Sequence, residues 1–260
     1  MKKLKVLGLA AIAAGMVTLT SCLDSGGNKQ TLQSYAIVDY SSTMRKLIYP
    51  LGYYPLYIPA VANDVNYNPG DCVIANYTVD FDSPDNANAS TNGFYVASGA
   101  ASSALPKYNF SFSESDSTAL EGEVLLSGAE SVLMMSANYQ RIIAEPIFES
   151  ILTDQKNDYR LMFDYDQEPA TVNSTERVYT LYLRCQKLTD GKAPTLSNAK
   201  DAAIFDAGQF YSTLKSRESA AGKKVASYQV KYAKSFNSDS TKVMTWGVSN
   251  ISQFSIAESE

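Results

Sequence analysis

Apolar and polar residues alternate in short runs along most of the chain. Between Cys72 and Asp82 every second residue is apolar, which is typical of a strand with one buried face. The same alternation predicts further strands at residues 34–40, 94–96, 108–112, 132–135, 147–152, 159–165, 178–187, 228–236 and 243–247. Polar turn residues separate these strands, so the fold class we predict is all-β.

One segment in the second half has helical periodicity instead. Ala207, Phe210, Tyr211 and Leu214 recur at intervals of three and four residues, and Asp206 precedes them as a candidate N-cap. We therefore expect one short helix here, at one end of the second domain.

The alternation of apolar residues weakens around residue 121 and is interrupted at Ser127 and Gly128, which indicates a domain boundary. We expect a first β domain at residues 35–128. The regular spacing of strands and turns beyond it predicts an antiparallel β-sandwich at residues 129–260.

The N-terminal residues have the features of a lipoprotein leader. Three lysines precede an apolar segment at residues 6–17, and Leu19–Cys22 resembles the lipobox of bacterial lipoproteins. We expect residues 1–21 to be a signal peptide and Cys22 to carry the lipid; the alternative is an ordinary signal peptide with a coincidental cysteine. The polar residues at 22–34 predict a flexible tether.

Charge and hydropathy restrict the partners. The chain has 22 basic and 27 acidic residues, and phosphate binding needs clustered cations, so we expect no nucleic-acid partner. After Val17 no apolar run approaches the ~20 residues that a membrane helix requires. The lipid on Cys22 is then the expected membrane attachment, at the outer membrane of the cell envelope, on either face.

Several short motifs resemble those of the NigD-like lipoproteins of Bacteroidota. The residues that carry the resemblance are Gly70, Asp71, Val73, Asn76, Tyr77, Thr78, Tyr228, Val230, Tyr232, Trp246 and Gly247. The resemblance covers nearly the whole mature chain. It implies an OB-like β-barrel at residues 35–128 followed by the β-sandwich, and it makes bacteriocin immunity one candidate role.

The catalytic possibilities are narrow because the chain contains no histidine, which removes Ser-His-Asp and Cys-His catalysis. The Ser-x-x-Lys pattern of penicillin-recognising enzymes occurs at both Ser197–Lys200 and Ser212–Lys215, without a Lys-Thr-Gly partner, and is best explained as chance. We expect no enzyme activity and no cofactor. A carboxylate-based glycan hydrolase is the least favoured alternative.

Cys72 and Cys185 remain once Cys22 carries lipid. An even pair in an exported protein can form a disulfide. Because the two residues fall in different predicted domains, we expect two separate reduced thiols instead.

Asp80, Asp82 and Asp85 are candidate calcium ligands, since alternate carboxylates followed by a loop acid offer hard oxygen atoms. They lack the spacing of an EF-hand loop, however. A solvated strand end entering a turn explains them more simply, so we expect no metal site.

Tyr49, Tyr53, Tyr54 and Tyr57 crowd a proline-rich segment between the first two strands. Proline restricts the backbone and tyrosine offers a rigid amphipathic ring, a combination suited to recognising a protein or a sugar ring. Packing between the domains is the alternative explanation of these rings.

Asp116-Ser117-Thr118 and Asp239-Ser240-Thr241 resemble the acceptor triplet for O-glycosylation of exported Bacteroidota proteins. Ser117 and Ser240 are therefore candidate modification sites.

A lipid-anchored protein without catalytic motifs is expected to act by binding. We predict a non-catalytic binding module for a protein or glycan partner, with the tyrosine-rich segment as its candidate surface. The alternative is a structural or assembly subunit of an envelope complex.

Overall fold

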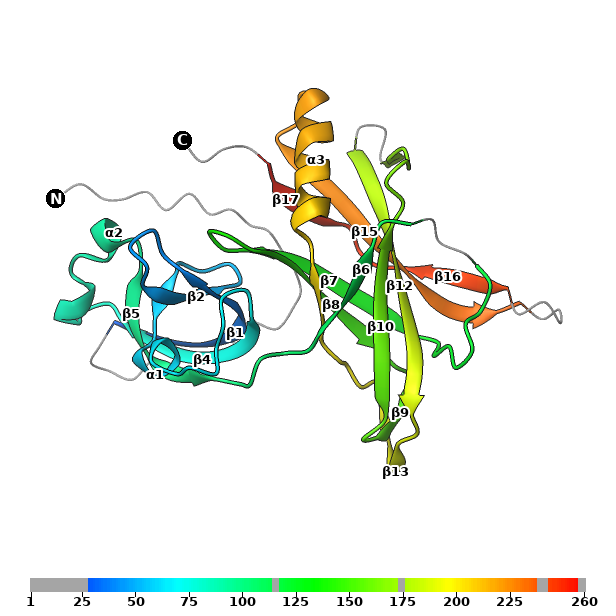
Figure 1. Ribbon diagram of the computed structural model, residues 1–260, viewed down its shortest axis with the longest axis horizontal. Coiled ribbons are helices and arrows are strands. Elements are labelled where there is room, and N and C mark those ends of the chain that lie inside the picture. Colours follow the sequence, from blue (N-terminus) through cyan, green and yellow to red (C-terminus); the bar gives the residue numbers. More distant parts are fainter. Residues whose placement is uncertain (1–27, 114–116, 173–175, 238–242, 257–260) are drawn as a thin grey trace.

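The computed structural model describes residues 28–113, 117–172, 176–237 and 243–256 and shows a mostly β protein, which confirms the predicted class. Two bodies lie side by side, a small barrel and a larger curled sheet (Figure 1). The predicted signal peptide, Cys22 and Ser240 lie outside the described residues.

The first body is a closed barrel with the strand order β1-β2-β3-β5-β4, which confirms an OB-like barrel at the N-terminal end. Its strands are β1 (Lys29–Tyr40), β2 (Lys46–Pro50), β3 (Leu56–Tyr57), β4 (Cys72–Asp80) and β5 (Tyr95–Ala101). Short helical turns lie between them, namely α1 (Pro59–Ala62), η1 (Pro84–Asn86) and α2 (Ala89–Asn92).

The barrel forms because β1 is long enough to pair on both sides. Its second half pairs with β2, with Ala36 opposite Pro50, and its whole first part pairs with β4, with Lys29 opposite Asp80. The alternation predicted for β4 is observed, since Val73, Ala75, Tyr77 and Val79 are buried in the barrel core.

The second body is one mixed sheet of ten strands with the main order β16-β15-β12-β10-β6-β14-β8-β7. These strands are β6 (Lys107–Ser111), β7 (Gly128–Met135), β8 (Gln140–Ile147), β10 (Lys156–Phe163), β12 (Glu176–Thr189), β14 (Ala203–Asp206), β15 (Val225–Phe236) and β16 (Met244–Val248). The sheet also includes β11 (Ala170–Val172) and β17 (Ser252–Ser255), while β9 (Ser150–Thr153) and β13 (Lys192–Ser197) form a separate pair.

This sheet differs from the expected antiparallel sandwich because three of its pairings are parallel. β6 runs parallel to β10 and β14, and β12 runs parallel to β15. Parallel neighbours need long crossover connections. Local alternation of apolar residues reports burial and not strand direction, so the sequence pattern could not reveal them.

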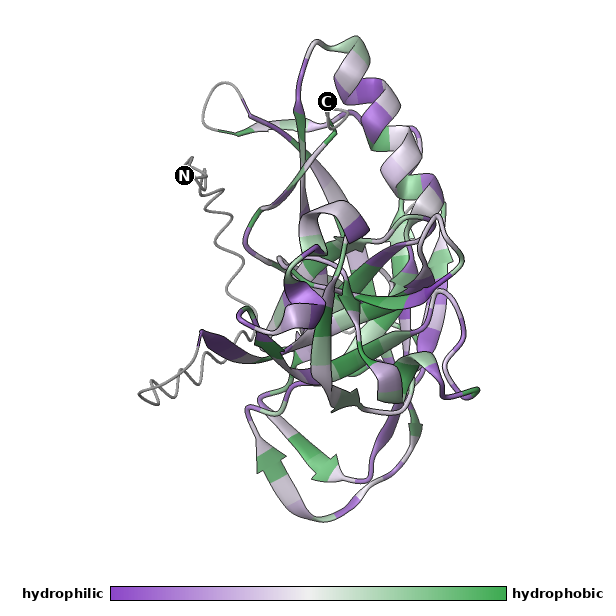
Figure 2. Cartoon of the chain, turned by 90° about the vertical axis from the view of Figure 1, so that its left-hand side faces the viewer, coloured by the Kyte–Doolittle hydropathy of each residue, from purple (hydrophilic) through white to green (hydrophobic). Residues whose placement is uncertain are grey.

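The sheet curls until its β7 edge meets the β15 side, which encloses the main core. Leu126 N donates to Ala233 O at 2.8 Å, and Ser252 Oγ donates to Ser131 O at 2.8 Å. Figure 2 shows apolar residues concentrated in the strands at the middle of the molecule. The fully buried rings of Phe163 and Phe210 meet there edge to face, with centroids 5.0 Å apart.

The predicted helix is present as α3 (Gly208–Ala220), with Phe210 and Leu214 buried. Its N-cap is Ala207, one residue later than expected. Asp206 still supports the first turn, because its Oδ1 accepts a hydrogen bond from Gly208 N at 3.1 Å.

Two predicted boundaries need correction. β1 already begins at Lys29, so residues 29–34 are strand and do not belong to a tether of residues 22–34. β6 pairs in the large sheet, so the strand at 108–112 does not belong to the barrel as the range 35–128 required. We propose that the two folding units divide between β5 and β6, near residue 104.

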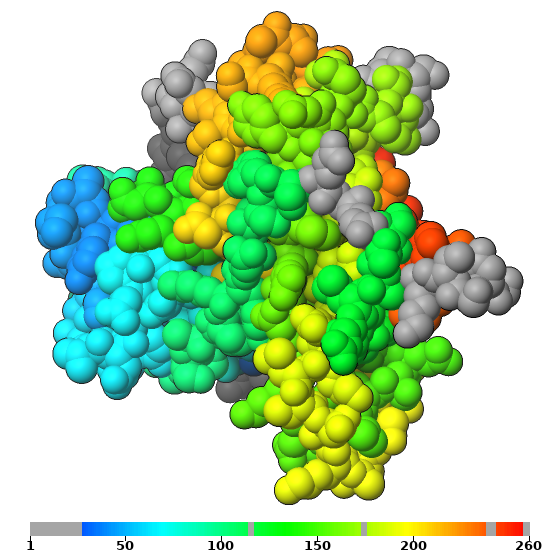
Figure 3. Space-filling model, turned by 45° about the vertical axis from the view of Figure 1, so that its right-hand side comes forward, coloured from blue at the N-terminus to red at the C-terminus, as the bar shows by residue number. Residues whose placement is uncertain are grey.

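A third apolar cluster joins the two bodies. Ile37 and Cys72 of the barrel pack with Met134, Ile143 and Ile204 of the sheet, and all five are buried. In Figure 3 the green residues around the β7–β8 turn lie against the blue and cyan barrel. We call this contact the seam.

Candidate functional site

The tyrosine-rich segment forms a braced turn between β2 and β3. Pro50 ends β2, Pro55 precedes β3, and Gly52 lies between them with a φ of +69° that favours glycine. Tyr53 N donates to Pro50 O at 3.3 Å, which closes the turn. The backbone of this turn is therefore fixed before any partner binds.

Tyr53 points from this turn onto the barrel. Its ring lies 5.8 Å from the ring of Tyr77, and its hydroxyl donates to Gln30 Oε1 at 3.2 Å. Burial raises the pKa of Tyr53 to about 12, helped by the neighbouring Tyr77 and Tyr95. Tyr53 thus forms a fixed, neutral wall.

Tyr54 has the opposite orientation, with 68% of its surface exposed. Its ring makes edge contacts with Tyr53 at 6.4 Å and with Tyr95 at 5.9 Å between centroids. The ring is supported on one side and open on the other, which is the arrangement an aromatic contact residue needs.

A pocket of about 620 Å³ lies between this turn and the end of β7. The lining residues come from both bodies and are Pro50, Leu51, Gly52, Tyr53, Tyr54, Pro55, Leu133, Met134 and Met135. Met135 is 43% exposed at its mouth, whereas Met134 is buried in the seam below. The tyrosine side of the pocket was predicted from the sequence, and the methionine side was not.

The lining is apolar and carries no charged side chain. Methionine is flexible and polarisable, and tyrosine is rigid and amphipathic, so together they suit an apolar or aromatic group. The polar groups of the lining are the tyrosine hydroxyls and the backbone.

The other two tyrosines of the predicted surface do not line the pocket. Tyr49 packs in the seam, where burial and the nearby Asp39 raise its pKa. Tyr57 packs on Phe94, and the Arg45 guanidinium lies 5.0 Å from its ring centroid. The structure therefore brings Tyr53 and Tyr54 together and separates Tyr49 and Tyr57 from them.

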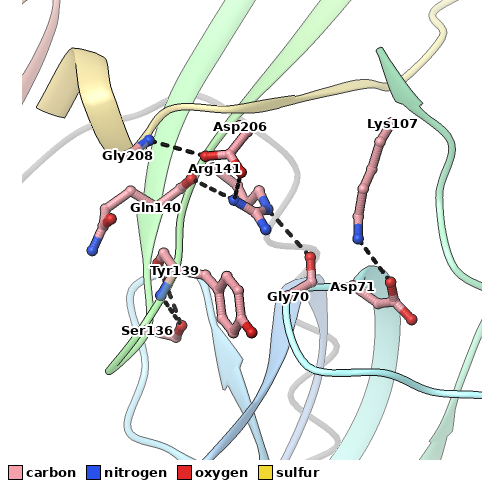
Figure 4. A network of polar contacts seen from close by, with 9 residues as sticks. All are labelled: Gly70, Asp71, Lys107, Ser136, Tyr139, Gln140, Arg141, Asp206 and Gly208. Atoms are coloured by element: carbon pink, nitrogen blue, oxygen red, sulfur yellow. Dashed lines mark hydrogen bonds and ion pairs between the residues drawn. The ribbon is translucent and has the colours of Figure 1, made fainter. Parts of the chain in front are cut away.

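A buried arginine connects the two bodies (Figure 4). Arg141 Nε donates to Gly70 O at 3.2 Å, and its Nη1 lies 3.0 Å from Asp206 Oδ2. The guanidinium also lies 4.9 Å from the ring centroid of Tyr139. Gly70 is one of the residues that carry the family resemblance, but nothing in the local sequence indicated that Arg141 would bind it.

Further polar contacts hold the seam. The carboxylate of Asp39 accepts from Asn138 N at 2.9 Å and from Asn138 Nδ2 at 3.0 Å. Tyr35 donates its hydroxyl to Glu145 at 2.7 Å, and burial together with this bond raises the pKa of Tyr35. Lys107 pairs with Asp71 at 2.9 Å. These contacts fix the two walls of the pocket relative to each other.

The candidate calcium ligands do not form a metal cluster. Asp80 pairs with Lys29 at 3.2 Å, Asp82 accepts from Asn28 N at 3.2 Å, and Asp85 lies in the helical turn η1. Among the described residues no group of three or more His, Cys, Asp or Glu side chains is placed to hold a metal ion. These three aspartates instead lie at the end of β4 and in the turn that follows it.

Ser117 is half-buried, and its Oγ accepts from Trp246 Nε1 at 3.3 Å. Its glycosylation stays a prediction, as does that of Ser240.

Cys72 and Cys185 are both free and buried, which confirms two separate thiols. Among the described residues no helix is long and apolar enough to span a bilayer.

The fold and the pocket together define the class of protein: an OB-like barrel packs against a curled mixed sheet, and residues of both line the pocket. Residues 26–103 match the model of the lipoprotein OB domain family, and the chain belongs to that family. The family implies a cell-envelope protein.

Several solved structures are similar to this chain. An uncharacterized protein from Parabacteroides merdae is 66% identical, with 87% of this chain and 100% of that one covered and a TM-score of 0.84. A putative lipoprotein from Bacteroides fragilis is 9% identical, covering 89% and 100%, with a TM-score of 0.49. A NigD-like immunity protein from Bacteroides caccae is 9% identical, covering 83% and 90%, with a TM-score of 0.45. A search of curated proteins found no match.

Proposed function

We propose that this protein is a lipid-anchored, non-catalytic binding module whose pocket takes an apolar side chain of a protein partner. The anchor is a diacylglyceryl group on Cys22 in the outer membrane. The observation that carries the binding proposal is the apolar pocket of about 620 Å³ between Tyr54 and Met135.

A protein partner fits this pocket better than a glycan. The side chains at the pocket mouth, Tyr54 and Met135, are exposed although they are large and apolar. Aromatic residues and methionine are enriched in protein interfaces. Sugar rings need several convergent hydrogen-bonding groups, and the pocket offers mainly tyrosine hydroxyls and backbone.

The rigid walls support the same proposal. The turn is braced by prolines, and the seam fixes β7 against the barrel through Arg141 and Asp39. A preformed pocket loses little conformational freedom when it binds, so more of the contact energy remains as affinity. If the partner were a bacteriocin, the same pocket would provide immunity.

Photo-crosslinking in intact cells tests the proposal. A benzophenone side chain is placed at Tyr54 and, as the matched control, at Tyr57, which belongs to the same segment but lies outside the pocket. We expect one discrete adduct from position 54, absent at position 57 and lost when Met135→Lys places a charge at the pocket mouth. Equal adducts from both positions, or an adduct insensitive to Met135→Lys, would exclude the pocket as the docking site.

A further inference from the structure

The barrel carries a group of aromatic rings at the end where the chain enters it. The ring centroids of Phe81 and Tyr95 lie 5.5 Å apart, those of Tyr95 and Tyr54 5.9 Å, and those of Tyr54 and Tyr53 6.4 Å. All four rings keep some surface exposed. We call this continuous group the aromatic rim.

The rim lies directly at the start of the described chain. Phe81 N donates to Asn28 O at 2.9 Å, and the hydroxyl of Tyr53 reaches Gln30 at 3.2 Å. The described chain therefore starts beside these rings.

Little chain separates this point from Cys22. Because β1 starts at Lys29, the link from Cys22 to Asn28 is six residue steps in the sequence. Fully extended, it spans roughly 20 Å. A globular body of this length is about 45 Å across, estimated from the usual scaling of its radius of gyration. A lipid on Cys22 would thus keep the rim end near the bilayer and allow the opposite parts to stay away.

We propose that the aromatic rim rests on the surface of the bilayer that holds Cys22; this inference depends on the lipid anchor of the proposed function. Tyrosine suits this position because its amphipathic ring is favoured at the boundary between hydrocarbon and water, and phenylalanine adds an apolar ring that faces the acyl chains. The pocket shares Tyr53 and Tyr54 with the rim, so it opens at the membrane surface. Its partner would then be reached there.

The charges around the rim indicate which lipid it meets. Lys29 is paired with Asp80, and Asp82 adds an exposed negative charge. An acidic surface is not attracted to anionic headgroups. The contact therefore comes from the rings, and a zwitterionic bilayer is the expected surface.

Fluorescence quenching by lipid tests this orientation. The mature chain is coupled through Cys22 to maleimide-bearing lipid in phosphatidylcholine–phosphatidylethanolamine vesicles that contain brominated acyl chains. Cys72 and Cys185 are buried and stay uncoupled. Tyr54→Trp supplies a reporter on the rim, Leu196→Trp supplies one on the exposed β13 of the other body, and the signal of Trp246, the chain's only tryptophan, is the baseline.

We expect the reporter at position 54 to be quenched several-fold more than the one at position 196, and Phe81→Ala to lower that quenching. Equal quenching at both positions, or stronger quenching at 196, would overturn the orientation. Flotation of the native protein from cells with unmodified vesicles tests the natural anchor separately. Its failure would contradict the lipid anchor of the proposed function, whereas the coupled sample still decides whether the rim meets the bilayer.

Discussion

Gly70 shows how a single residue controls the contact between the two bodies. Its φ is +83°, and a Cβ there would lie 2.8 Å from Arg141 Nη2 and 2.9 Å from Tyr139 Cδ1. Both the backbone and the space therefore require glycine. The family resemblance includes Gly70, but the close approach of Arg141 depends on the fold.

Gly70→Ala should lower the free energy of unfolding by about 2–4 kcal/mol, because strain at the left-handed backbone adds to displacement of a buried arginine. Gly52→Ala is the matched control, with a φ of +69° and nothing within 4 Å of the added Cβ. Gly52→Ala should lower the free energy of unfolding by roughly 1 kcal/mol. Urea unfolding measures both, and equal losses would contradict the role given to the Gly70 contact.

Cys72 makes stability depend on alkaline pH. Burial raises the pKa of its thiol to about 12 from an ordinary value of 9.0, although Arg141 and Lys107 oppose the shift. The folded state thus holds this proton more tightly than the unfolded state does. The contribution of this thiol to the free energy of unfolding is fully present below pH 9. It falls as the pH rises from 9 towards 12.

We expect the free energy of unfolding to decline above pH 9 and Cys72→Ala to make that decline shallower, by up to about 1.4 kcal/mol per pH unit. The comparison is made between pH 9 and 10, where ionisation of the tyrosines contributes equally to both proteins and cancels. Parallel curves for the two proteins would show that Cys72 ionises equally in both states.

At the scale of elements, β1 is where composition misled the prediction. Residues 29–34 are mostly polar, which favoured a tether, but Leu32 and Ser34 are buried and the segment pairs with β4. Its stability comes from the ladder with β4, which no local window can reveal. The strand at 72–80 was predictable because its own alternation matches its burial.

Hydrogen exchange tests the first part of β1. The amides of residues 30–34 that bond to β4 should exchange as slowly as the central amides of β4. The turn at Glu121 and Gly122 is an exposed reference and should exchange rapidly. Rapid exchange at residues 30–34 would mean that they belong to a flexible tether after all. A longer link would allow the rim to leave the bilayer, so this result would also count against the proposed orientation at the membrane.

The whole molecule depends on the seam, which the sequence could not show. Ile37 and Cys72 fall in strands predicted for the first domain, whereas Ile143 falls in no predicted strand. The three residues meet because β7 and β8 extend onto the barrel. Likewise the pocket combines the tyrosine turn, which was predictable from its prolines, with Met135, which was not. The tyrosine wall could be predicted from residue types in one segment, whereas the methionine wall depends on tertiary packing.

The seam should make the barrel and the sheet unfold together. Ile143→Ala truncates a fully buried side chain in the seam. The free energy of unfolding should fall by about 2–4 kcal/mol, by the same amount for the barrel and for the sheet. Hydrogen exchange at increasing urea would follow peptides from β4 and β12 in parallel. Separate transitions in the wild-type protein would mean that the bodies are independent and the pocket walls are not fixed.

Affinity for the crosslinked partner tests the binding proposal most directly. The purified partner would be titrated against the wild type, Met135→Lys, and Met44→Lys as a control, because Met44 is 75% exposed and outside the pocket. We predict that Met135→Lys weakens binding by at least tenfold, which corresponds to about 1.4 kcal/mol, and that Met44→Lys leaves it unchanged. Equal affinities for all three proteins would contradict the account.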